Sequence, residues 1–86
     1  MSNTPPVNFS QFIVSLASSA LVHLGEIAEP GSNEPKVDLT LARHTIDLIT
    51  MLQEKTSGNL SSDETKLVEA VLGDLRTKFL TVSSAD

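Results

Sequence analysis

Apolar side chains recur every three or four positions in three stretches of the chain, residues 9–24, 38–56 and 61–80. This spacing places the side chains of each stretch on one face of an α-helix. The three predicted core faces consist of Phe9, Phe12, Ile13, Leu16, Ala20 and Leu24; of Leu39, Ala42, Ile46, Ile49 and Leu52; and of Leu67, Val68, Val71, Leu72, Leu75 and Phe79. The pattern predicts an all-α fold, a small domain of three helices without an extensive sheet.

Local signals mark where these helices begin and end. Asn8, Asp38 and Ser61 are suited to cap the three N-termini, and Ser61 with Glu64 forms a capping-box pattern. Gly25 and Gly58 are suited to the left-handed positions that end helices. Only about four residues separate the second and third helices, so we expect an antiparallel hairpin around Gly58.

The remaining segments are assigned by composition. Residues 1–8 are expected to form a disordered lead, 9–80 a single helical domain and 81–86 a disordered tail. The 26–37 segment is long for a helix–helix connection. Its role is not indicated, although Ile27 and Val37 flank a Pro-Gly turn and are placed to pair as a very short hairpin.

The first predicted helix differs from the other two because residues 1–25 contain no Asp, Glu, Lys or Arg. A helix without charged residues is usually packed over most of its circumference, against its own chain, another subunit or lipid. An 86-residue chain offers few neighbours, so we expect a homo-oligomer, with a C₂ dimer favoured. The predicted interface consists of Val14, Ser15, Ser18, Ser19, Leu21 and Val22.

A membrane role is the alternative interpretation of the same helix, as an anchor for a membrane-associated accessory protein. Seven polar residues interrupt the 18-residue stretch 7–24, and no Lys or Arg precedes Lys36. A transmembrane helix needs about 20 mostly apolar residues, and a secretory signal needs a positive start. A membrane span and a signal peptide are therefore both disfavoured.

Composition argues against several kinds of chemistry. Eleven acidic and six basic residues give a net charge of −5, and the aromatic residues are three Phe, so nucleic-acid binding is not expected. There is no Cys, which excludes disulfides and thiolate zinc sites. His44 and Asp47 offer only two metal ligands, and His23 falls on another helix. With no nucleophile motif either, we predict no enzymatic activity, no metal and no cofactor.

Small residues at helical spacing suggest close packing. Ser15 and Ser19 are four apart on the first helix, and Ala70 and Gly73 are three apart on the third. A glycine inside a helix costs about 1 kcal/mol relative to Ala. Gly73 is therefore interpreted either as a site of close helix contact or as a tolerated surface glycine.

Four segments resemble one bacterial family, catalogued as domain of unknown function 1844. They are SLASSALVHLGE (15–26), LARHTID (41–47), LQEKTSGNL (52–60) and DLR (74–76), and the resemblance extends over about residues 9–79. It implies a bacterial, cytoplasmic, all-helical protein and brings no established activity. Lys55, Thr56, Gly58 and Asn59 match its most specific segment, which from the residues alone is a helix stop.

Two functional hypotheses follow. The first is a helical homo-oligomer that serves as a binding or scaffolding module, with an unknown protein as a further partner left open. The second is the accessory protein anchored in a membrane through the first helix. A corner formed by Lys55, Thr56 and Asn59 is the candidate site for a protein partner.

Overall fold

A computed structural model of the protein describes residues 8–28, 31 and 33–84. It contains three helices, α1 (Phe9–His23), α2 (Leu39–Lys55) and α3 (Ser62–Ser83). The described residues form no strand, and their only sheet-like pairing is an isolated antiparallel bridge between Leu24 and Val37. The predicted all-α fold with three helices is therefore confirmed.

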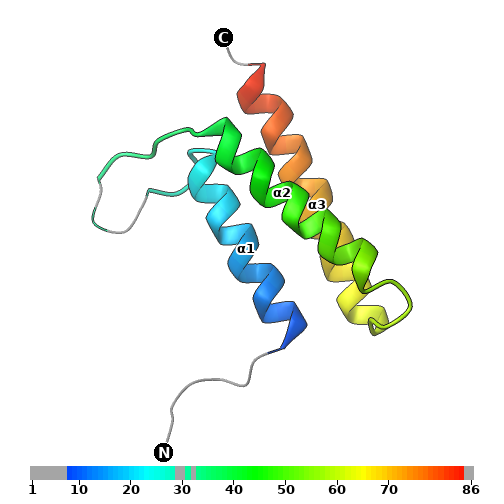
Figure 1. Ribbon diagram of the computed structural model, residues 1–86. Coiled ribbons are helices and arrows are strands. Elements are labelled where there is room, and N and C mark those ends of the chain that lie inside the picture. The colour runs from blue at the N-terminus through cyan, green and yellow to red at the C-terminus, as the bar shows by residue number, and fades with distance from the viewer. Residues whose placement is uncertain (1–7, 29–30, 32, 85–86) are drawn as a thin grey trace, which may run out of the picture.

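The three helices lie against one another, and each contacts the other two. In Figure 1, α1 lies beside α2, and a tight turn at the end of α2 leads directly into α3. The molecule is flat, with principal extents of 40 × 34 × 17 Å. A flat arrangement of three helices leaves much of the outer surface of each helix available for contact with other molecules.

One hydrophobic core joins the helices. Its buried members are Ile13, Ala20, Leu24, Ala42, Ile46, Ile49, Val68, Leu72 and Leu75. All nine were assigned to core faces by the sequence pattern. Phe12 was assigned there too, and that assignment is wrong, because the side chain is 49% exposed. Ile13 and Ala20 define the buried line of α1, and Phe12 lies about 100° around the helix from Ile13.

The helix starts match the predicted capping residues. Asn8 Oδ1 accepts a hydrogen bond from the Gln11 amide at 2.8 Å, and Asp38 Oδ1 accepts one from Leu41 at 3.0 Å. Ser61 and Glu64 form the full capping box, with bonds of 3.1 and 2.8 Å. Each cap satisfies backbone N–H groups that the helix itself leaves without a partner.

A close backbone connection fixes the end of α1 against the start of α2. The amide of Asp38 donates to the His23 carbonyl at 2.7 Å, next to the Leu24–Val37 bridge. The bridge therefore involves Leu24 rather than the predicted Ile27. Gly25 has a φ of +81°, and a Cβ atom at this position would lie 2.8 Å from Val37 Cγ2. This glycine permits the chain to leave α1 and still pass close to Val37.

The ends of the domain differ slightly from expectation. Helix α3 continues to Ser83, three residues beyond the predicted end, and Val82 packs against the core. The hydroxyl of Thr81 donates to the Thr77 carbonyl at 3.0 Å. The predicted disordered lead lies outside the described residues except for Asn8, and so do residues 85–86 of the predicted tail.

Candidate functional site

The outer face of α1 carries no ionised side chain. Its exposed residues are Gln11, Phe12, Val14, Ser15, Ser18 and Ser19. Phe12 and Val14 are each 49% exposed, and they lie on opposite flanks of a strip of serines. Only Ile13 and Ala20 of this helix are buried, compared with four residues of α2. At about 100° per residue, the six exposed residues span an arc of roughly 160° that the described remainder of the chain leaves uncovered.

The predicted interface divides into two groups. Val14, Ser15, Ser18 and Ser19 are exposed, whereas Leu21 and Val22 are partly buried. Leu21 packs against the core of its own chain.

Phe12 belongs to the exposed surface, and the sequence analysis missed it because the i, i+3 spacing from Phe9 grouped it with the core. Its angle from Ile13 was the available signal. We call Phe12, Val14, Ser15, Ser18, Ser19 and Val22 the α1 face.

The predicted partner-binding corner lies where α2 ends. Lys55 and Asn59 are exposed and Thr56 is partly buried. The Thr56 hydroxyl donates to the Leu52 carbonyl at 2.6 Å, and the Thr56 carbonyl accepts from the Asn59 amide at 2.9 Å. Gly58 adopts a φ of +87°. Thr56 and Gly58 therefore serve to end α2, and partner binding through Lys55 and Asn59 stays a prediction.

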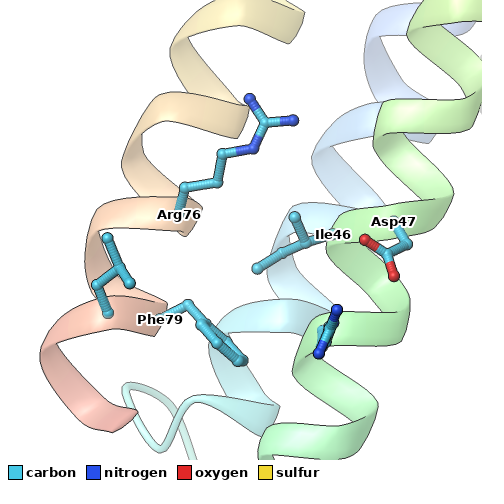
Figure 2. Close-up of a pocket in the computed structure, with 6 residues that line it drawn as sticks. Ile46, Asp47, Arg76 and Phe79 are labelled. Carbon is cyan, nitrogen blue, oxygen red and sulfur yellow. The ribbon is translucent and has the colours of Figure 1, made fainter. Parts of the chain in front are cut away.

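A hollow that sequence analysis did not anticipate lies between α2 and α3. It has a volume of about 310 Å³ and is lined by Arg43, Ile46, Asp47, Arg76, Phe79 and Leu80. Figure 2 shows Arg76 extending from α3 toward α2, with Ile46 and Phe79 below it. No residue of α1 lines the hollow. Its lining residues come from two separate segments, 43–47 and 76–80, so no local sequence pattern indicates the hollow.

Two successive hydrogen bonds join α3 to α2 at one side of the hollow. Arg76 Nη2 donates to Thr50 Oγ1 at 3.0 Å, and the same hydroxyl donates to the Ile46 carbonyl at 2.9 Å. A hydroxyl group can accept and donate at once, so both bonds are satisfied. Thr50 therefore holds the Arg76 guanidinium across the gap between the helices.

An ion pair on the exposed side of α3 joins Lys78 Nζ to Asp74 Oδ1 at 3.0 Å. The hydrogen bond and the charge of Asp74 raise the pKa of Lys78. Arg43 and Asp47 lie one turn apart on α2 without forming an ion pair.

The two histidines lie on different helices. His23 is partly buried at the end of α1, and His44 is exposed on α2. Among the described residues, no group of three or more His, Cys, Asp or Glu side chains is arranged to hold a metal ion.

None of the described helices is long and apolar enough to span a membrane.

These features define a small all-α protein of three helices with an uncharged outer face on its first helix. Residues 6–81 match the family model described as Domain of unknown function (DUF1844), and the chain belongs to that family. The resemblance seen in the sequence is therefore confirmed. No curated protein and no solved structure matches the chain.

Proposed function

We propose that this protein is a non-catalytic helical module that associates with a second copy of itself through the α1 face and acts in binding or scaffolding. The observation that carries the proposal is a helix face without charge, bearing two half-exposed apolar side chains, in a chain of net charge −5. Membership of the family supports the helical fold and assigns no activity.

Charge distribution favours a second copy as the occupant of the α1 face. All eleven acidic residues follow Gly25, so α1 itself carries none of them. Two acidic copies repel each other least where neither presents a carboxylate. Pairing through α1 also removes Phe12 and Val14 from water, which is worth roughly 25 cal/mol per Å² of apolar surface.

The shape of the α1 face suits a two-fold pair. We consider an antiparallel crossing whose two-fold axis passes at the height of residue 17 along α1. Phe12 of one copy then lies opposite Val22 of the other, and Ser15 lies opposite Ser19. The small serines allow the two helix backbones to approach to about 8 Å. A C₂ axis uses the same surface on both copies, which closes the assembly as a dimer.

In this proposal, α2 and α3 form an antiparallel hairpin around Gly58, and α1 packs against that hairpin. The turn conformation of Gly58 and the Arg76–Thr50 hydrogen bond between the helices support it. Ile49 and Leu72, from the two helices, share the buried core, and Figure 1 draws α2 and α3 side by side.

The first prediction concerns the mass of the protein in solution. Light scattering coupled to size-exclusion chromatography should give twice the 9.2 kDa chain mass at high micromolar concentration. Ser15→Glu should give the mass of a single chain, because it places a carboxylate at the centre of the α1 face. Glu is at least as good a helix former as Ser, so helicity by circular dichroism should be retained.

Ala70→Glu is the matched control. Ala70 is exposed on α3, and this variant adds the same charge outside the proposed interface. It should remain a dimer. A wild-type protein that stays a single chain at high micromolar concentration contradicts the proposal, as does equal dissociation of the two variants.

A further inference from the structure

The second surface of interest is the hollow between α2 and α3, which no residue of α1 lines. Ile46, 7% exposed, and the partly buried Phe79 give it an apolar floor. The other four lining residues, Arg43, Asp47, Arg76 and Leu80, are exposed, and Leu80 is 64% exposed. The hollow is thus an open apolar site with a charged rim.

Both arginines of the chain lie at this rim. The sequence contains Arg43 and Arg76 and no other Arg, and they come from different helices. Within the residues that the structure describes, Arg76 makes one hydrogen bond, to the neutral Thr50 hydroxyl. Arg43 makes no hydrogen bond or ion pair there. Within the part of the chain that the structure describes, neither guanidinium is paired with a carboxylate, although most of the eleven acidic residues of the chain lie in that part.

Unpaired guanidinium groups beside an apolar floor are suited to a ligand that combines carboxylates with an apolar group. An arginine presents five N–H donors in a planar arrangement that matches a carboxylate, often through two parallel hydrogen bonds. We propose that the hollow binds an acidic peptide segment of a partner protein, with one apolar side chain on Ile46 and Phe79 and flanking carboxylates on Arg43 and Arg76.

The openness and size of the hollow favour a peptide over a small molecule. Small-molecule sites commonly enclose most of their ligand and measure about 300–1,000 Å³. This hollow is at the lower limit of that range, and most of its lining is exposed. It covers one side of an apolar side chain and leaves the rest of a peptide in water.

Charge also argues against a nucleic acid or an anionic membrane as the occupant. Both present extended arrays of phosphates, which a chain of net charge −5 repels over its whole surface, whereas a short peptide brings only a few charges to the hollow. Asp47 lies on the same rim and adds local repulsion. The carboxylates of a short peptide are on flexible side chains, and the proposal requires them to contact Arg43 and Arg76 rather than Asp47.

Nuclear magnetic resonance can test the site directly. The ¹⁵N-labelled full chain is titrated with the capped peptide Gly-Asp-Glu-Leu-Glu-Asp-Gly and with the same peptide carrying Ser in place of Leu. Saturable shifts of the Ile46 and Phe79 amides are expected with the first peptide. The Ser peptide should bind several-fold more weakly, because it lacks the apolar anchor.

Two variants separate the local effect from net charge. Arg43→Gln combined with Arg76→Gln should weaken binding by about tenfold or more, because two charged hydrogen-bonding groups are removed. Lys66→Gln combined with Lys36→Gln removes the same net charge outside the hollow and should change affinity less than about twofold. Circular dichroism checks that both double variants remain folded.

Several results overturn the proposal. They are an absence of shifts at millimolar peptide, equal binding of the Leu and Ser peptides, and equal loss of affinity in the two double variants. Saturation of the same amides by sodium octanoate without any effect of the peptide would assign the hollow to a small amphiphile. Peptide binding should persist in Ser15→Glu, so the result is independent of self-association through α1.

Discussion

At the scale of single residues, Gly25 and Gly58 adopt similar backbone conformations in different surroundings. Their φ angles are +81° and +87°. A Cβ atom at Gly25 would lie 2.8 Å from Val37 Cγ2, whereas one at Gly58 would lie more than 4 Å from any non-adjacent residue that the structure describes. The two positions therefore separate the cost of the left-handed conformation from the cost of a steric clash.

We predict that Gly25→Ala lowers the free energy of unfolding by about 2–3 kcal/mol and Gly58→Ala by about 1 kcal/mol. Both variants bear the left-handed penalty of roughly 1–2 kcal/mol, and only the first also displaces Val37. Urea denaturation at a fixed protein concentration measures both values. Equal losses in the two variants would show that Val37 moves aside without cost.

Much of what the sequence could predict depends on interactions between residues that are close in the chain. Asn8, Asp38 and Ser61 were identified as caps because a cap depends on side chains within three positions. Phe12 was misassigned because its i, i+3 spacing from Phe9 grouped it with the core, although its angle from Ile13 places it at the edge of the apolar arc. The hollow between α2 and α3 could not be predicted from local signals, since Arg43 and Arg76 are brought together only by helix packing.

At the scale of the element, Gly73 is notable because it lies inside α3, where a glycine is unfavourable. The sequence left open whether it marks a close helix contact or an exposed position. Gly73 is exposed, and a Cβ atom there would meet no other atom of the described chain within 4 Å. The described residues thus make no contact that requires a glycine at this position.

We predict that Gly73→Ala raises the free energy of unfolding by about 0.5–1 kcal/mol, because Ala restricts the unfolded chain more than Gly does. Thermal denaturation followed by circular dichroism measures the effect. The variant should also keep the mass of the wild-type assembly in light scattering. Destabilisation together with loss of the dimer would instead place a subunit contact on α3 and argue against the α1 face.

The lengths of the elements were predictable to within a few residues because periodicity and caps agree. The largest difference is at the end of α3, where Val82 packs against the core and the helix continues to Ser83. Thr81 and Ser83 are polar and suggested a tail from composition alone. A tertiary contact made by one apolar residue extends the helix beyond the limit that local composition indicates.

At the scale of the whole molecule, the two proposed surfaces differ in their electrostatics. The α1 face is uncharged, so the charge that affects dimerisation is the net −5 of each copy. The hollow between α2 and α3 would attract acidic peptides through Arg43 and Arg76. Salt screens repulsion in the first case and attraction in the second. The Debye length falls from about 30 Å at 0.01 M to about 8 Å at 0.15 M ionic strength.

We predict that sodium chloride has opposite effects on the two equilibria. Between about 0.01 and 0.15 M ionic strength, the dimer should become tighter, because repulsion between two acidic copies is screened. Over the same range the acidic peptide should bind more weakly. Sedimentation equilibrium measures the first dissociation constant and the peptide titration measures the second, with Ser15→Glu used for the titration so that self-association does not contribute. A dimer that weakens as salt rises would be held by charged contacts, and since α1 carries no Asp, Glu, Lys or Arg, its interface would have to lie outside α1.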